Sequence, residues 1–431
     1  MSPRVSAARR REVVDALRRG AVPEAGLDLF AVGLARFEMA VDEDLAAVAA
    51  GGAVFKAVRG EYGSGKTFFS RWLGERAKRL NLATAEVQVS ETETPLHRME
   101  TVYRRLVERL VTEQFTPSAL RPILDGWIFA LEEDVLSLGT VAEDDAPGLD
   151  NAVGELLERR LAAISRATPG FAAALRGYRT ASAAGDMTTA DGLAAWLGGQ
   201  PHVAASARRV AGVKGDLDHF GALSFLQGLL TVLRDSGHPG LLLVLDEVET
   251  LQRVRSDARD KALNALRQLV DDVYAGRFPG LLLMITGTPA FYDGTQGVQR
   301  LAPLAQRLAT DFGPDPKWDN PRAVQIRLPG FTIDALVELG VKVRWLFDHP
   351  RVSRVDDAYI AELARAVTGK LGGQVGVAPR IYLKKLVDVL DRVDQFDDWD
   401  PRQHYALTMR PNELTDVERN YVTADDLDLP L

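Results

Sequence analysis

The sequence contains no cysteine among its 431 residues. Disulfide bonds and thiolate metal sites are therefore excluded, and nothing points to an oxidising compartment. The chain also lacks any run near the ~20 apolar residues that a membrane-spanning helix needs. No apolar segment of the signal-peptide type follows the N-terminal arginines. These absences predict a cytoplasmic protein with no membrane partner.

The sequence also has few histidines, and its net charge is negative. The six histidines are scattered without the H-E-x-x-H spacing of a zinc site, so we expect each to be an ordinary packing or surface residue. The formal net charge of −8 argues against a protein that coats nucleic acid through bulk electrostatics. Two interpretations, a local basic face or a solvated helix surface, remain for the arginines of the first expected helix: Arg9, Arg10, Arg11, Arg18 and Arg19.

Residues 60–67 have the G-x-x-x-x-G-K-T spacing of a phosphate-binding loop. Glycines let backbone N–H groups face a polyphosphate, while Lys66 can reach the β and γ oxygens and Thr67 can ligate Mg²⁺. An apolar run precedes the loop and a helical pattern follows it, as the motif requires. The expected nucleotide contacts are Gly60, Glu61, Tyr62, Gly63, Ser64, Gly65, Lys66, Thr67 and Phe68.

Five short apolar runs among helical patterns predict an α/β fold with a parallel five-stranded sheet. The runs at residues 241–245 and 281–286 are continuously apolar, which is typical of parallel strands buried on both faces. The others are residues 53–58, 84–89 and 323–328.

The helical patterns also suggest a division of the chain. Residues 1–330 are expected to form the core that carries the phosphate-binding loop, with a helical insertion at about 112–218. Residues 331–395 are expected to form a C-terminal helical lid, and residues 396–431 a C-terminal tail that ends in a loose acidic segment.

An acid pair follows the strand at residues 241–245. Asp246 ends the strand, where a carboxylate can hold Mg²⁺ through water, and Glu247 is placed to polarise a water for attack on the γ-phosphate. The next strand ends in the sequence MITGTP, which offers Thr288, or Thr286 as second choice, to hold the water or the γ-phosphate.

Arginines are further candidates, because phosphoryl transfer concentrates negative charge that a guanidinium stabilises. Arg307 is our first choice for a residue that enters a neighbouring subunit's site, and Arg300 is its rival. Arg380 opens a helix of the expected lid, from which it can reach the γ-phosphate. An ordinary surface role is the alternative for each.

Together these features resemble the AAA+ ATPases, most closely their initiator-type and transposition-regulator branch. The resemblance implies that Lys66 and Thr67 hold phosphate and Mg²⁺, Asp246 holds Mg²⁺, Glu247 activates water, and Thr288 is a sensor. It also implies a trans finger at Arg307 and a lid sensor at Arg380. The sequence FAVGLARFE resembles the adenine-pocket segment of that branch, which gives Val32 and Gly33 as base contacts.

Several longer segments, including VRGEYGSGKTFF, GLLLVLDEVETLQR and VAPRIYLKKLVDVLD, look like the BrxD family of BREX system ATP-binding proteins. The resemblance implies a bacterial phage-defence role, ATP rather than GTP, a homo-oligomer, and other BREX proteins as partners. It leaves open whether DNA is contacted directly or through partners. The expected activity is ATP hydrolysis that assembles or remodels a DNA-associated complex; the alternative is a nucleotide-gated scaffold with little or no hydrolysis.

Overall fold

The computed structural model describes residues 5–115, 117–139, 141–142, 144–373, 376 and 379–419. The predicted loose acidic end of the chain lies outside these residues. The chain forms two compact units. We call Met1–Val41, Val58–Glu75 and Asp311–Leu431 the loop-and-lid unit, and Asp42–Ala57 and Arg76–Thr310 the sheet-and-insertion unit.

The predicted parallel sheet is confirmed, with five strands in the order β2-β3-β4-β1-β5 among the described residues. Strands β3 and β4 are buried along their whole length, as their unbroken apolar runs predict. In the register, Gln88 at the end of β2 lies opposite Asp246 at the end of β3. The strands are β1 (Ala53–Arg59), β2 (Ala83–Gln88), β3 (Leu241–Asp246), β4 (Leu281–Gly287) and β5 (Gln325–Arg327).

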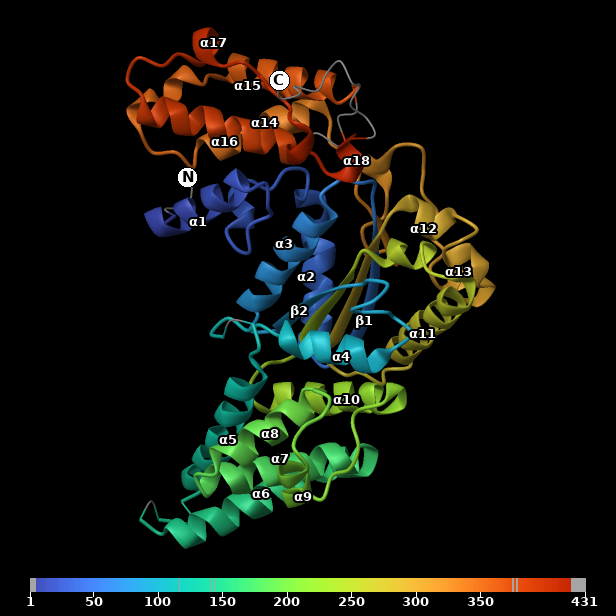
Figure 1. The fold of residues 1–431 in the computed structure, drawn as a ribbon. Coiled ribbons are helices and arrows are strands. Elements are labelled where there is room, and N and C mark those ends of the chain that lie inside the picture. The colour runs from blue at the N-terminus through green and yellow to red at the C-terminus, as the bar shows by residue number, and fades with distance from the viewer. Residues whose placement is uncertain are drawn as a thin grey trace. The chain divides into compact units, whose positions relative to one another are not determined.

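The helices of the sheet-and-insertion unit fall into two groups. Those that follow the strands include α4 (Met99–Glu108), η2 (Val248–Gln252), α11 (Ser256–Tyr274), α12 (Pro289–Asp293), η3 (Val298–Arg300) and α13 (Ala302–Arg307). A second group lies apart from the strands in Figure 1. It consists of α5 (Leu120–Ser137), α6 (Ala146–Ala167), α7 (Pro169–Ala183), α8 (Met187–Leu197) and α9 (Ala205–Val210).

Helix α10 (His219–Asp235) joins the second group to the sheet, because it packs against α4, α5, α6 and α7 and leads into β3. Phe225 of α10 is the centre of this packing. Its ring lies 5.8 Å from Tyr103, 5.0 Å from Phe171 and 5.1 Å from Trp196, measured between ring centroids and edge-on in each case. All four aromatic side chains are buried. A single ring on α10 therefore ties α4, α7 and α8 together.

The loop-and-lid unit contains a helical bundle near the C-terminus, in which α14, α15 and α16 pack against one another. Helix α1 packs on α16, and Arg10 and Arg18 of α1 pair with Asp348 and Asp391. Its helices are α1 (Ala7–Arg18), η1 (Leu27–Leu29), η4 (Pro316–Trp318), α14 (Ile333–Arg344), η5 (Pro350–Arg354), α15 (Asp357–Lys370), α16 (Pro379–Gln395), α17 (Pro401–His404), η7 (Pro411–Glu413) and α18 (Asp416–Arg419). Helices α2 (Ala35–Ala49) and α3 (Lys66–Arg79) continue into the other unit.

Candidate nucleotide site

The phosphate-binding loop connects β1 to α3 and depends on its glycines. Gly63 and Gly65 have φ angles of 79° and 90°, in the left-handed region that favours glycine. A Cβ atom on Gly60 would lie 2.3 Å from the Ser64 hydroxyl oxygen, so a side chain there would clash. The spacing of these glycines therefore sets the path of the loop.

Lys66 is the first residue of α3 and is buried within the loop. Its ammonium donates to the carbonyl oxygens of Gly60 at 2.9 Å and Glu61 at 3.3 Å, and lies 5.1 Å from the ring centroid of Tyr62. The loop thus holds the Lys66 ammonium against its own backbone carbonyls. A phosphate that binds in the loop can replace these carbonyls as the partner of the ammonium.

The loop fits a bound polyphosphate in two further respects. The Ser64 hydroxyl is buried without a hydrogen-bond partner among the described residues, so it is available as a donor. The first turn of α3 holds no acidic residue, and the positive end of the helix dipole favours an anion there. Glu61 and Tyr62 are exposed on the loop, whereas Thr67 and Phe68 are half-buried at the start of the helix.

The expected adenine segment belongs to the same unit as the loop. Gly33 is exposed with a φ of 73°, and Val32 next to it is half-buried. The Phe30 ring meets Phe68 edge-on at 5.2 Å, which joins the segment to the first turn of α3. Lys342 of α14 donates to the carbonyl of Ala31 at 2.6 Å, which joins it to the lid. The segment therefore contacts α3 through Phe30 and α14 through the Ala31 carbonyl.

The acid pair lies at the carboxyl end of β3. Asp246 is buried, and its Oδ1 accepts from the Glu247 amide at 3.0 Å and from the Thr286 hydroxyl. Glu247 has φ 59° and ψ 43°, a left-handed conformation that is uncommon for a residue other than glycine. Such conformations are concentrated at functional sites.

Thr286 at the end of β4 and Thr288 just after it differ in their contacts. Thr286 is completely buried, donates to Asp246 and lies 3.4 Å from the Glu247 amide. Thr288 is buried and precedes α12, where its side chain makes no capping hydrogen bond. In the described residues, the second-choice threonine of the sequence prediction is therefore the one in contact with the acid pair.

Sequence reasoning missed Gln88. Its amide donates to Oε2 of Glu247 at 2.8 Å, because β2 and β3 are in parallel register and their carboxyl ends meet at one edge of the sheet. The only signal in the sequence is a polar residue that ends the second strand, before Val89 and Ser90. Gln88 therefore holds the carboxylate that is expected to activate water.

The candidate arginines all form ion pairs within their own unit. Arg307 pairs with Asp271 and donates to the carbonyl of Pro303 at 2.7 Å. Arg300 pairs with Asp260, also on α11, and donates to the Ser256 hydroxyl at 2.7 Å. Arg380 pairs with Glu418. Each candidate arginine is therefore held by a carboxylate of its own unit.

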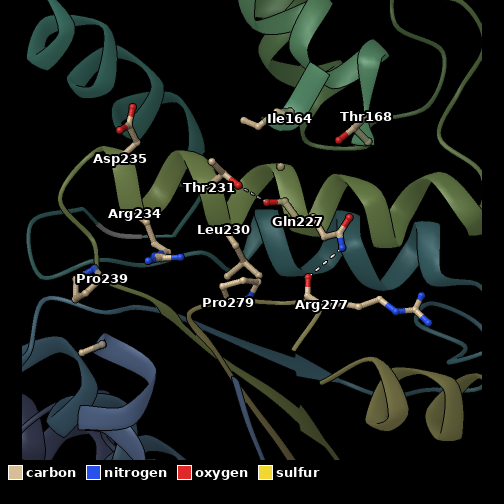
Figure 2. A pocket seen from close by; sticks show the side chains of 12 residues that line it. Ile164, Thr168, Gln227, Leu230, Thr231, Arg234, Asp235, Pro239, Arg277 and Pro279 are labelled. Carbon is tan, nitrogen blue, oxygen red and sulfur yellow. Dashed lines mark hydrogen bonds between the residues drawn. The ribbon is translucent and has the colours of Figure 1, made fainter. Parts of the chain in front are cut away.

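A cavity of about 620 Å³ lies elsewhere in the sheet-and-insertion unit (Figure 2). Pro239 and Pro279, which line it, come just before β3 and β4, so the cavity is at the end of these strands opposite Asp246. The Gln227 side-chain amide donates a hydrogen bond to the carbonyl of Arg277 at 3.0 Å (Figure 2). The cavity is therefore separate from the acid pair.

The described residues offer neither a metal-binding cluster nor a membrane-spanning helix. Within those residues, no group of three or more His, Asp and Glu side chains is arranged to hold a metal ion. No described helix combines the length and apolar character needed to cross a membrane.

Comparison with known proteins assigns the chain to a family. A comparison with curated proteins finds no match. The model of the family described as BREX system ATP-binding protein BrxC/D matches residues 5–409, which is most of the chain. The chain therefore belongs to the family of BREX system ATP-binding proteins BrxC/D.

Proposed function

We propose that this chain is a BrxD-type AAA+ ATPase that hydrolyses ATP and uses the cycle to assemble or remodel a DNA-associated complex in phage defence. Family membership supports ATP binding and the BREX context. The hydrolytic part of the proposal is supported chiefly by one observation, the hydrogen-bonded set in which Gln88 and Thr286 hold Glu247 and Asp246.

The proposed substrate is ATP with Mg²⁺. The loop amides and Lys66 would bind the phosphates, with Val32 and Gly33 at the base. Thr67 and Asp246 would hold Mg²⁺, which neutralises charge on the phosphates when bound. Thr288 would act as a sensor, whereas Thr286 would position Asp246 through its observed hydrogen bond.

Glu247 would accept a proton from the attacking water as the new oxygen–phosphorus bond forms. The bond from the bridging oxygen to the γ-phosphorus then breaks, and ADP and phosphate leave. Gln88 donates to Oε2 of Glu247 and would orient the carboxylate for this step. A carboxylate has acceptor positions beyond this one hydrogen bond, so it can hold the contact and still accept the proton.

The test is ATP turnover measured against protein concentration for the wild type and Glu247→Gln, with and without duplex DNA. We expect turnover that rises as the chain assembles and falls at least a hundredfold in Glu247→Gln, because general-base catalysis contributes about 10²–10⁴-fold. ATP affinity should be retained in this variant. Wild-type protein without turnover at any concentration, with DNA and BREX partners supplied, would refute the enzymatic proposal.

A nucleotide-gated scaffold is the second candidate. It is favoured by the observation that Arg300, Arg307 and Arg380 are all engaged by carboxylates of their own unit. The helices α5–α9 also offer a surface beyond the sheet itself (Figure 1). In this case ATP would change the affinity for a partner with little hydrolysis, and equal partner affinity with and without ATP would rule it out.

A further inference from the structure

Helix α16 begins with a concentration of positive charge. Arg380 lies in its first turn, and Lys384 and Lys385 lie in the next. The amino end of a helix is itself the positive end of the dipole, so cations there are disfavoured unless an anion is present. This end of α16 therefore requires negative charge from elsewhere.

The C-terminal segment at residues 410–419, which we call the latch, supplies that charge. Glu418 accepts from Arg380 Nε at 2.9 Å and, through its second oxygen, from Arg380 Nη2. The Glu413 carbonyl accepts from the same Nη2 at 2.6 Å, and the Glu413 carboxylate accepts from Lys385 at 2.9 Å. Two latch carboxylates thus pair with the three cations at the start of α16.

Contacts within the latch hold the Glu413 and Glu418 carboxylates in position. Glu418 is only 3% exposed, and its carboxylate also accepts from the Thr415 amide at 2.7 Å. The Arg410 amide donates to Glu413 at 3.1 Å. Leu414, which lies between Glu413 and Glu418 in the sequence, is buried. The buried Glu418 carboxylate is stabilised by its ion pair with Arg380 and by the Thr415 amide.

We propose that the latch is an autoinhibitory element, in which Glu418 occupies Arg380 in place of a nucleotide phosphate. The inference rests on the proposed function, extended by the sequence-based expectation that Arg380 contacts the γ-phosphate of the bound nucleotide. The forked contact to Glu418 uses the paired guanidinium donors that suit a phosphate equally well. One arginine cannot serve both anions in this way, so nucleotide binding and latch closure oppose each other.

A closed latch is expected to raise the apparent dissociation constant for the nucleotide. If the latch is open in about one molecule in ten, the apparent dissociation constant for a ligand that needs Arg380 is about tenfold higher than the intrinsic one. Removing the Glu418 charge should restore most of this difference. The site would then be regulated by whatever pulls residues 410–419 away from α16.

The experiment measures binding of a fluorescent, non-hydrolysable ATP analogue with Mg²⁺ to the full chain. We expect Glu418→Gln to bind about tenfold more tightly than the wild type. Asp397→Asn, which removes a carboxylate from the Arg351 pair in the same unit, is the matched control and should leave binding unchanged. The gain should disappear in Glu418→Gln combined with Arg380→Met, because the released arginine then has no guanidinium.

The outcomes separate the latch from the proposed function. Equal affinity of Glu418→Gln and wild type, or a gain that persists without Arg380, would overturn the latch alone. Failure of every variant to bind, or binding by Lys66→Ala as tight as wild type, would overturn the proposed nucleotide site itself. As a second readout, amide hydrogen exchange in residues 410–419 should rise when the analogue binds wild-type protein; unchanged exchange would also overturn the latch.

Discussion

At the scale of single residues, Glu247 combines an unfavourable backbone with a held side chain. A left-handed conformation at a residue other than glycine costs about 1–3 kcal/mol and persists only where its surroundings enforce it. Here the Glu247 amide donates to Asp246 and the carboxylate accepts from Gln88. The strained residue is therefore fixed at both its backbone and its side chain.

The roles of Thr286 in β4 and Thr288 just after it can be distinguished by valine substitutions, which keep the shape of the side chain and remove the hydroxyl. We expect Thr286→Val to lower ATP turnover by at least tenfold, because it deprives the buried Asp246 carboxylate of a donor worth about 1.5–3 kcal/mol. Thr288→Val is the matched comparison, measured in the same turnover assay. A larger loss in Thr288→Val would instead support the sensor that the sequence predicts at this position.

At the scale of elements, the start of α10 carries two phenylalanines with opposite surroundings. Phe225 is buried among Tyr103, Phe171 and Trp196, whereas Phe220 is 80% exposed on the same helix. This packing attaches α7 and α8 to α4 and α10, together with the hydrogen bond from the Tyr103 hydroxyl to the Leu197 carbonyl at 2.9 Å.

We expect Phe225→Ala to destabilise this attachment by about 3–5 kcal/mol, the usual range for removing a buried phenylalanine. Amide hydrogen exchange should speed up in α7 and α8 and change much less in β3 and β4. Phe220→Ala is the control from the same helix and should change neither. Uniform acceleration across both groups of elements would show that the insertion and sheet unfold as one.

At the scale of the whole molecule, the question is whether Arg307 or Arg300 acts in the site of a neighbouring subunit. Both pair with aspartates of α11 in their own chain. A role in trans would couple subunit contact to hydrolysis, because the arginine of one subunit would then complete the site of its neighbour.

Mixing two inactive variants tests this arrangement. Glu247→Gln and Arg307→Ala should each lack turnover, but a mixture should regain part of it, because some sites then combine an intact Glu247 with a neighbour's intact Arg307. The same mixture made with Arg300→Ala is the comparison. If neither mixture recovers activity although each arginine variant is inactive alone, the arginine acts within its own chain.

The sequence by itself determined the features that depend on neighbouring residues. The phosphate-binding loop at residues 60–67, the acid pair at Asp246 and Glu247, and the buried strands are each contiguous, so spacing and apolar runs are enough to predict them. Only the tertiary structure decided the contacts between distant residues. Gln88 meets Glu247 across 159 residues through strand register, and Arg380 meets Glu418 across 38 through packing of the C-terminal segment. No local pattern specifies such pairs, because which polar side chains meet depends on how the elements align in space.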